Sequence, residues 1–550
     1  QQYGGERITY YGGGGQGNHL VGASAMGLRA ALGTKYKSNA IAQEKTGLSW
    51  VFSRMIGDMP SPVVEHAQVA MLVGKNPFLS NGMDQARLFL REIRKDPNRT
   101  LIVVDPRRSE TADFADIHLA VRPGRDAWCM AAIVGHLVQA QLLPMDWLEQ
   151  HADGYQEIIE TFADIPVDKF SSFAGLDPDL VKEAARLIGE AESFALEEDI
   201  GIQMAPHSTL VTYLNFLTML STGNYGKPGT MGLVTQLASV ISLHNAKVDE
   251  SGREVSVARL PVTGAPIVSG LYPSACMAEE ILNDHPDRFR AMVVESSNPV
   301  HSLPESARMR KAIRSLDFSV AVDVAMTETA RQADYVLPAS SQFEKAEATF
   351  FNLEFPDNVF HLRQPLFGPM TGTLDEAEIM ARLLEETADL GERDYRALRV
   401  AAKAGLTVFS TVFLARMAVN PKLMKYVAPI LYRTLGPTLP PGMEMAAVVW
   451  GLSLMYIRSH PVQAKRAGFG GPLPLAANRL FKAILDSPSG VVYARSTYEE
   501  SWEGVRRAGN RINLAIPELL QELAKIRQDR PSRNEVFPFC LLYTSPSPRD

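Results

Sequence analysis

Short apolar runs recur along much of the chain, and each one ends in a cluster of Gly, Pro, Asn, Asp or Arg. Residues 69–73 run into Gly-Lys-Asn-Pro, residues 101–104 into Asp-Pro-Arg-Arg, and residues 117–121 into Arg-Pro-Gly-Arg-Asp. A helical pattern at 83–95 separates the first two runs, with enough chain for a crossover helix. The pattern predicts parallel strands whose ends meet at one edge of a sheet, where we expect a nucleotide to bind.

A second set of apolar runs, at 291–294, 318–322 and 335–337, repeats this organisation. Asn298-Pro299 follows its first run much as Asn76-Pro77 follows the run at 69–73. We therefore expect an α/β fold. It would consist of two Rossmann-like lobes with mostly parallel sheets around a shared cofactor crevice, followed by a helical extension.

The expected division of the chain is discontinuous. The first Rossmann-like, dinucleotide-binding lobe comprises residues 46–204, the second comprises 1–45 with 205–370, and the helical extension comprises 371–535. Residues 33–68 show no clean period, and we expect them to form a long loop. Within the extension, residues 446–457 are apolar on nearly all sides, which is typical of a buried helix.

The bulk composition excludes several classes of protein. With 46% apolar and 21% charged residues the chain has the profile of a globular protein, and 550 residues are too many for one core. A net charge of −7 argues against broad nucleic-acid binding. No apolar run reaches the ~18 residues of a membrane span. Cys129, Cys276 and Cys540 are far apart, and an iron–sulfur cluster needs about four thiolates, so this chain should hold none.

Polar residues at the ends of the runs suit particular ligands. Asp105 can accept hydrogen bonds from ribose hydroxyls or guanine N–H groups, and Arg107 would suit phosphate. Asp126 precedes a helical pattern at 127–140, where a helix N-cap and a ligand contact are both consistent with its position. His207 precedes another helical pattern, and there a structural or capping role and a catalytic role both remain open.

Taken in order, the motifs of the chain form a specific set. They are 74–77 (GKNP), 104–107 (VDPR), 111–112 (TA), 122–126 (RPGRD), 201–203 (GIQ), 206–208 (PHS), 222–229 (TGNYGKPG), 297–299 (SNP), 326–330 (MTETA) and 333–338 (ADYVLP). This set resembles the prokaryotic molybdopterin oxidoreductases, the dimethyl sulfoxide reductase and formate dehydrogenase family. The resemblance covers roughly residues 5–365, and it is specific because many blocks agree in order.

The resemblance implies a molybdenum or tungsten ion held by the dithiolenes of two pterin guanine dinucleotides, that is, Mo-bis(molybdopterin guanine dinucleotide). In the first lobe, one dinucleotide would contact Gly74, Asn76, Pro77, Asp105, Arg107, Gly124 and Asp126. In the second lobe, the other would contact Asn298, Asp323, Thr327, Glu328 and Thr329. Near the pterin and the metal would lie Gln203, His207, Ser208, Gly223 and Asn224, with His207 handling protons.

The protein ligand to the metal departs from the family pattern. It is commonly Cys, selenocysteine, Ser or Asp, in a region that corresponds here to residues 38–47, which contain no Cys. Glu44 falls closest to the ligand position, and a carboxylate suits an oxophilic metal. The alternatives for Glu44 are a salt bridge with Lys45 or Arg54, or a contact with substrate. Ser38 and Gln43 are the other candidate ligands.

Both ends of the chain also depart from the family pattern. Family members usually begin with a Cys-rich segment for a [4Fe-4S] cluster, which we expect in a missing N-terminal segment. Residues 536–539 are expected to start a missing C-terminal cofactor-binding domain. Residues 540–550 are expected to be a non-native read-through tail, with a genuine polar tail as the alternative.

The resemblance implies the catalytic subunit of an oxidoreductase, performing two-electron redox or oxygen-atom transfer on a small molecule in the manner of a formate dehydrogenase. Its partner would be an electron-transfer protein, with no nucleic acid and no membrane span. The expected location is the cytoplasm, and the periplasm stays open because the start is missing. The alternative is a non-catalytic scaffold subunit of a respiratory-type complex that keeps the fold without the metal.

Overall fold

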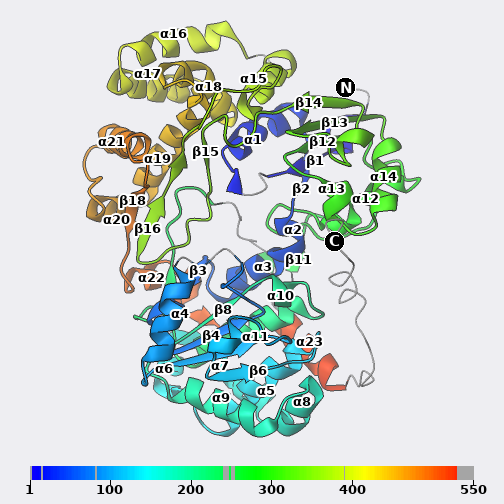
Figure 1. The fold of residues 1–550 in the computed structure, drawn as a ribbon, viewed down its shortest axis with the longest axis vertical. Helices are drawn as coiled ribbons and strands as arrows, with labels where there is room; N and C mark the ends of the chain where they lie inside the picture. Colours follow the sequence, from blue (N-terminus) through cyan, green and yellow to red (C-terminus); the bar gives the residue numbers. More distant parts are fainter. Residues whose placement is uncertain are drawn as a thin grey trace. The chain divides into compact units, whose positions relative to one another are not determined.

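A computed structural model describes residues 3–13, 17–80, 83, 85–239, 247–248, 254–388 and 390–528 (Figure 1). The chain divides into two compact units, which we name after one aspartate in each. The Asp105 lobe comprises the described residues within Glu44–Val234, Leu243–Ser256 and Thr497–Asp550. The Asp323 lobe comprises those within Gln1–Gln43, Thr235–Ser242 and Val257–Ser496.

The Asp105 lobe is built on a parallel sheet with the strand order β6-β5-β4-β8. Its strands are β4 (Val69–Val73), β5 (Thr100–Val104), β6 (Ile117–Leu119) and β8 (Phe194–Glu198). Every residue of β4 is buried, because a parallel strand that is covered on both faces is apolar along its whole length. The parallel strands predicted for this lobe are confirmed.

Helices cover both faces of this sheet. Ala70 and Leu72 of β4 belong to the core that α4 (Ala86–Lys95) completes. Met71 and Val73 belong to the core formed with α5 (Asp126–Gln139) and α11 (Ser208–Ser221). Successive side chains of a strand point to opposite faces, so one continuous apolar run supplies both layers.

The other elements of the Asp105 lobe surround this frame. They are α3 (Thr46–Met55), β3 (Pro60–Pro62), α6 (Met145–His151), β7 (Ala152–Asp153), α7 (Tyr155–Phe162), α8 (Val167–Ala174), α9 (Pro178–Glu190), α10 (Ile200–Gln203), β9 (Met231–Leu233), β10 (Lys247–Val248), β11 (Glu254–Ser256), α22 (Glu500–Glu503), β19 (Ile512–Asn513) and α23 (Pro517–Gln528).

The Asp323 lobe contains a second parallel sheet, with the strand order β14-β13-β12-β1-β2. Its strands are β1 (Ile8–Gly12), β2 (Tyr36–Ser38), β12 (Ala291–Glu295), β13 (Phe318–Asp323) and β14 (Tyr335–Pro338). Met292 packs in a core with α12 (Met277–Leu282) and α14 (Ser306–Arg314). Val322 packs in another core with α1 (Val21–Leu32) and α15 (Glu376–Thr387). The predicted fold class is confirmed: each lobe is α/β with a parallel sheet.

A helical segment follows within the Asp323 lobe. Its elements are α16 (Glu392–Lys403), α17 (Leu406–Val419), α18 (Val427–Thr434), α19 (Ala447–Ser459), α20 (Pro461–Arg466) and α21 (Leu473–Asp486). The short elements of this lobe are α13 (Pro299–Ser302), β15 (Glu347–Ala348), β16 (Asp357–Phe360), β17 (Leu362–Arg363) and β18 (Val491–Arg495). Helix α2 (Ile41–Glu44) also starts in this lobe, but its last residue, Glu44, belongs to the Asp105 lobe. Trp450 of α19 is fully buried, as predicted for the apolar helix at 446–457. Measured over the described ranges, every helix falls short of the length and hydropathy that crossing a bilayer requires.

The prediction of a long loop at 33–68 is wrong. The segment contains β2, α2, α3 and β3. Polar residues break the apolar pattern along its length, but α3 still buries Val51, Phe52 and Met55, which share one helical face.

The packing also differs from the expected lobe boundaries. Helix α11 begins after the expected boundary at 204/205, yet it packs against α3 and α5 in the Asp105 lobe. Helix α23 packs there as well, and Trp128 Nε1 donates to the Ile526 carbonyl at 3.2 Å. The expected helical extension 371–535 is therefore split between the lobes. The segments expected at 536–539 and 540–550 lie outside the described residues.

Candidate functional site

An asparagine just past the central strand of the Asp105 lobe organises the loops at the carboxyl edge of the sheet. Asn76 follows β4, and its Oδ1 accepts a hydrogen bond from Thr111 Oγ1 at 2.7 Å. Its Nδ2 donates to Glu110 Oε2 at 2.9 Å. Pro77 beside it is buried. The asparagine side chain thereby ties the loop after β4 to the loop after β5.

The Asp323 lobe contains the same arrangement. Asn298 follows β12, and its Oδ1 accepts hydrogen bonds from Thr329 N at 3.1 Å and Thr329 Oγ1 at 2.8 Å. Its Nδ2 donates to Glu328 Oε2 at 2.6 Å. We call this Asn–Glu–Thr arrangement the loop clamp. In the sequence it is marked by Asn-Pro after one strand and Glu-Thr-Ala after the next strand. The Asn-Pro motifs at 76–77 and 298–299 therefore correspond to a repeated structure.

Two aspartates occupy matching positions at these edges. Asp105 directly follows β5, and its Oδ1 accepts a hydrogen bond from Arg107 N at 2.8 Å. Asp323 ends β13, and its Oδ2 accepts one from Thr327 Oγ1 at 3.2 Å. The Arg107 side chain donates to Glu110 Oε2 at 3.1 Å. The structure therefore gathers Asn76, Asp105 and Arg107 at one edge, and it gathers the predicted residues of the other lobe at the second edge.

Asp126 is the first residue of α5 rather than its N-cap, which is Arg125. Its carboxyl group is buried, and this burial, together with the nearby charge of Asp105, raises the pKa of Asp126 to about 6. Gly124, with φ +77°, makes the turn that precedes the helix. The edge of the Asp105 lobe thus presents two neighbouring carboxyl groups, which suits a ligand with several N–H or O–H donors.

Gly74 permits a close approach of two loops at this edge. Its φ is +59°, and a Cβ atom placed on it would lie 2.7 Å from Ile202 N. Its carbonyl accepts a hydrogen bond from Gly201 N at 3.1 Å. The matching residue of the other lobe, Ser296, also has a positive φ, of +49°.

Replacing Gly74 by Ala should destabilise the Asp105 lobe by about 2–4 kcal/mol, because a left-handed backbone and a steric overlap add together. Gly264 is the matched control, since its φ is +68° and nothing lies within 4 Å of its Cβ position. There, Ala should cost only about 1 kcal/mol. Urea unfolding of both variants checks this. Equal losses would show that the contact with Ile202 contributes nothing.

A buried polar cluster lies at the end of β8. The Glu198 carboxylate accepts hydrogen bonds from Gln203 Nε2 at 3.1 Å, Thr212 Oγ1 at 2.7 Å and Asn215 Nδ2 at 2.7 Å. Burial raises the pKa of Glu198. Within the described residues, Gln203 Oε1 is buried without a hydrogen-bond donor. Sequence reasoning missed Glu198, although a carboxylate that directly ends an apolar strand is a usable signal.

Lys75 organises an ion-pair network beside that cluster. Its buried ammonium group lies 2.8 Å from Glu197 Oε1 and 3.0 Å from Asp199 Oδ2. Lys45 in turn lies 3.2 Å from Asp199 Oδ1. Glu44 makes no direct ion pair within the described part of the chain, and burial raises its pKa, with Lys45 opposing the rise. Glu44 therefore presents a half-buried carboxyl group beside a network in which two lysines balance two carboxylates.

The other candidates for the metal position have structural partners. Ser38 Oγ donates to the Tyr272 carbonyl at 2.6 Å, which fixes the end of β2. Gln43 opposes the rise that burial causes in the pKa of Tyr11, which places its side chain near that hydroxyl. Arg54, one alternative partner for Glu44, stacks its guanidinium 3.4 Å from the Trp50 ring centroid.

His207 occupies the N-cap position of α11 with φ +58°, but its side chain makes no capping hydrogen bond. Its Nδ1 lies 2.8 Å from Glu522 Oε1, and its ring packs edge-on against Trp128. Ser208 is the first residue of the helix. The segments that carry Glu44 and His207 are neighbours, because a Cβ on Gly47 would lie 2.8 Å from Thr209 Oγ1.

Gly223 and Asn224 lie away from this edge. Asn224 Oδ1 accepts a hydrogen bond from Phe194 N at 2.9 Å, and its Nδ2 donates to the Thr222 hydroxyl at 2.8 Å. Phe194 starts β8, so Asn224 anchors the amino end of a strand whose carboxyl end carries Glu198. The structure does not bring these two residues together with Asp105. Both residues have a structural role: Asn224 fixes the start of β8, and Gly223, with φ +73°, forms the adjoining turn.

The Asp323 lobe has its own buried charged cluster at the carboxyl edge, which the sequence did not reveal. Tyr10 donates to Glu295 Oε2 at 3.1 Å, and Lys345 pairs with Glu376 and, at 3.7 Å, with Glu347. All five side chains are buried. Burial raises the pKa values of Glu295 and Glu347 to about 7 in each case, with the Glu376 charge adding to the rise and Lys345 opposing it.

Glu295 should make the Asp323 lobe less stable as the pH rises. Its folded pKa of about 7 lies above the ordinary 4.5, so the folded lobe holds the proton more tightly than the unfolded chain does. The free energy of unfolding should therefore fall between pH 4.5 and about 7, by up to about 3 kcal/mol from this group. Glu295→Gln should remove part of that fall, and Glu347 should retain the rest. Thermal unfolding across this pH range checks the prediction, with exposed Glu386→Gln as control. An unchanged pH slope in Glu295→Gln would contradict it.

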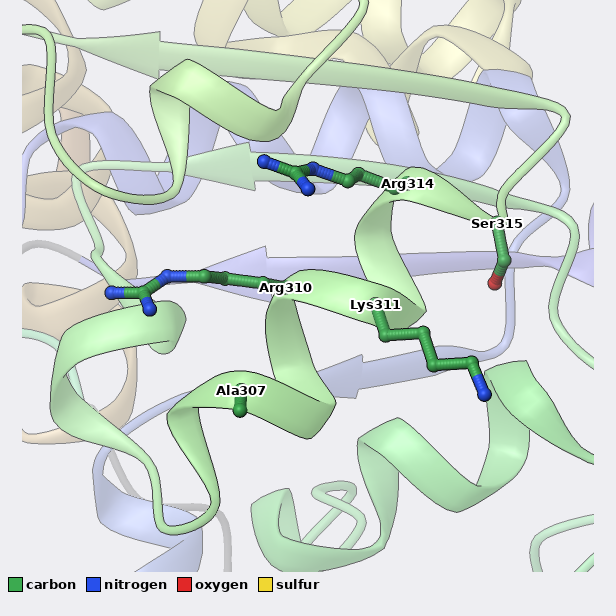
Figure 2. A pocket seen from close by; sticks show the side chains of 5 residues that line it. All are labelled: Ala307, Arg310, Lys311, Arg314 and Ser315. Carbon is green, nitrogen blue, oxygen red and sulfur yellow. The ribbon is translucent and has the colours of Figure 1, made fainter.

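Helix α14 contributes positive charge close to the Asn298 loop clamp. Figure 2 shows Arg310, Lys311 and Arg314 lining a shallow hollow, with the two arginines extending in the same direction. Arg314 Nε donates to Gln332 Oε1 at 2.6 Å. Arg310 helps lower the pKa of Glu328, after the larger effect of the Asn298 hydrogen bond. Guanidinium groups in this position suit phosphate oxygens.

Over the described ranges, no group of three or more His, Cys, Asp or Glu side chains is arranged to hold a metal ion. The two cysteines described, Cys129 and Cys276, are free, and burial raises the pKa of both thiols.

Comparison with known proteins gives a family for this architecture. A family model described as molybdopterin oxidoreductase matches residues 24–385. The F420-dependent formate dehydrogenase subunit alpha of Methanocaldococcus jannaschii is 28% identical over 56% of this chain and 46% of its own length. The assimilatory nitrate reductase catalytic subunit of Bacillus subtilis is 25% identical over 65% of this chain and 52% of its own length. The chain thus spans about half the length of the curated relatives it matches.

A solved structure shares the fold. The acetylene hydratase from Pelobacter acetylenicus superposes with a TM-score of 0.59, covering 71% of this chain and 57% of that one, at 20% sequence identity. The likeness concerns the arrangement of the chain and carries no conclusion about substrate.

Proposed function

Since the chain belongs to the molybdopterin oxidoreductase family, we propose that it forms the cofactor-binding part of a molybdenum or tungsten oxidoreductase with two pterin guanine dinucleotides. The observation that carries this proposal is the loop clamp, repeated at the carboxyl edge of both parallel sheets. Ligands of open α/β sheets bind outside the carboxyl ends of the strands. Two matching edges therefore support two similar ligands.

The residues present fit such a ligand. In the Asp105 lobe, the paired carboxyl groups of Asp105 and Asp126 would accept hydrogen bonds from guanine N–H groups. Gly74 lets the loop after β4 approach the Gly201–Ile202 backbone closely, and the buried Gln203 Oε1, which has no donor within the described residues, would accept a hydrogen bond from the pterin. The other contacts proposed for this half are Asn76, Pro77, Arg107, Gly124 and Ser208. In the Asp323 lobe they are Asn298, Asp323, Thr327, Glu328 and Thr329. That the two lobes share one cofactor crevice stays a prediction.

When bound, the metal–pterin group would supply two-electron redox chemistry or oxygen-atom transfer. Glu44 is our proposed protein ligand to the metal. Its burial favours the neutral carboxyl group, and a cation at the site would favour the carboxylate. His207 is our proposed proton-handling residue. With Nδ1–H donated to Glu522, Nε2 is the free base of that tautomer and can take up or release a proton.

The substrate proposed is a small molecule of the formate class, by analogy with the formate dehydrogenase relatives, and the electrons would pass to a partner protein. Measurement of metal and pterin in a longer form of the protein tests the proposal. We expect molybdenum or tungsten, with two equivalents of GMP released by acid hydrolysis for each metal ion. A folded protein with neither metal nor pterin would overturn the proposal and leave a scaffold subunit that keeps the fold alone.

A further inference from the structure

The helical segment carries a charge opposite to that of the rest of the chain. Between residues 392 and 495 there are fourteen Lys and Arg against four Asp and Glu, a net charge of +10, whereas the whole chain carries −7. The remaining residues therefore carry −17. A strongly basic segment within an acidic protein attracts negatively charged partners.

One helix of this segment exposes an apolar stripe. Val408, Val412, Ala415 and Val419 of α17 follow the spacing i, i+4, i+7 and i+11, which places them on one face. Val408 is 45% exposed and Val419 is 87% exposed. The single charged residue of this helix, Arg416, is turned away to α16, where it donates to Asp394 Oδ1 at 3.0 Å. Ala415 is exposed as well, whereas Val412 is half-buried and packs against the core. The stripe is thus free of charge, and its first residue and its last two residues are exposed.

Lysines stand at both ends of the stripe. Lys403 ends α16, just before the helix begins, and Lys422 and Lys425 follow shortly after it ends. All three are exposed. An apolar row flanked by basic residues complements an amphipathic helix whose apolar row is flanked by Asp or Glu.

We propose that the α17 stripe, Val408–Val412–Ala415–Val419, docks an acidic amphipathic helix of a partner protein. This surface is independent of the metal chemistry proposed above. Two copies of this chain would not pair through the stripe, because Lys403 of one copy would then face lysines of the other. A lipid surface fits less well, since helices that lie in a membrane interface turn bulky aromatic side chains outward. In α17 both aromatic residues, Phe409 and Phe413, are buried in the core.

The test measures binding of the full chain to two synthetic helical peptides and to phosphatidylglycerol vesicles. The peptides share one leucine row, and their flanking residues are all Glu in one and all Lys in the other. We expect the Glu peptide to bind, more weakly as NaCl is raised, and the Lys peptide and the vesicles not to bind. Val408→Gln with Val419→Gln, and separately Lys403→Glu with Lys422→Glu, should each weaken binding at least about tenfold.

The control is Val462→Gln, which changes a valine of α20 that is 50% exposed. It should leave binding of the Glu peptide unchanged, and circular dichroism should show that every variant is folded. The proposal would be overturned if the Glu peptide did not bind or if both peptides bound equally. It would also be overturned if the stripe variants left binding unchanged, or if the vesicles bound through the stripe.

Discussion

Replacing Glu44 by Gln in a metal-loaded, longer form of the protein should remove one oxygen neighbour from the metal and lower kcat by about a hundredfold or more. Gln has almost the same volume as Glu but no charge, so the packing around α2 is preserved. The ion pairs that Lys75 makes with Glu197 and Asp199 do not involve the Glu44 carboxyl group and should persist. X-ray absorption at the metal edge and the steady-state rate are the two measurements.

Glu92→Gln, on the exposed side of α4, is the control for this experiment and should change neither measurement. A metal spectrum that is the same in wild type and in Glu44→Gln would remove Glu44 as the ligand. Activity lost with an unchanged spectrum would instead assign Glu44 to substrate contact, one of the alternatives that the sequence left open.

Replacing Asn298 by Asp should open the loop clamp of the Asp323 lobe. The new carboxylate could still accept from Thr329 N and Oγ1, but it would face Glu328 Oε2 across the 2.6 Å contact that Asn298 Nδ2 makes now. Two carboxylates at this separation cannot both stay ionised without cost, so we expect a loss of stability near neutral pH. The loss should shrink in acid, where one carboxyl group takes a proton. Urea unfolding at several pH values measures it.

Asn283→Asp provides the matched comparison. Asn283 Nδ2 also donates to a glutamate, Glu279 Oε1 at 3.0 Å, but this pair is exposed. Water and salt screen the new repulsion there, so the loss should stay below about 1 kcal/mol. If both variants lose the same stability, the Asn298 clamp is no more than a surface contact.

The two parallel sheets could be predicted from the sequence because most of their strands are apolar runs. In the Asp105 lobe, β4 and β5 are buried on both faces, whereas the edge strand β14 of the other sheet leaves Tyr335 exposed. Strands that are buried on both faces read as unbroken apolar runs, and the residues that follow them, such as Asn76 and Asp105, stand at fixed places on the edge. Only part of the loop clamp could be predicted from the sequence. The sequence shows that Asn76-Pro77 and Asn298-Pro299 are a repeated motif. It does not show the hydrogen bonds from these asparagines to Glu110 and to Glu328, because those residues are distant in sequence.

Other parts depend on contacts that no local pattern contains. Asn224 was assigned to the site by motif, yet its amide holds the start of β8, and only the pairing of that strand shows which edge it serves. The cluster around Glu295 joins β1, β12, and residues 345–347 with α15, four separate stretches of the chain. Helix α3 was missed because its buried face consists of a few residues among polar ones.

The loop clamp is repeated, but the residues around it are not. In the Asp105 lobe the loops beside it carry Lys75, Arg107 and Arg108. At the matching places the Asp323 lobe has Ser297, Ala325 and Met326. Lys75 is paired with Glu197 and Asp199, whereas the positive charge near the Asn298 clamp comes from Arg310 and Arg314 of α14. Two identical anionic ligands would therefore meet differently arranged charges. Under the proposed function, the two edges would therefore be non-equivalent binding sites, each with its own affinity for its ligand.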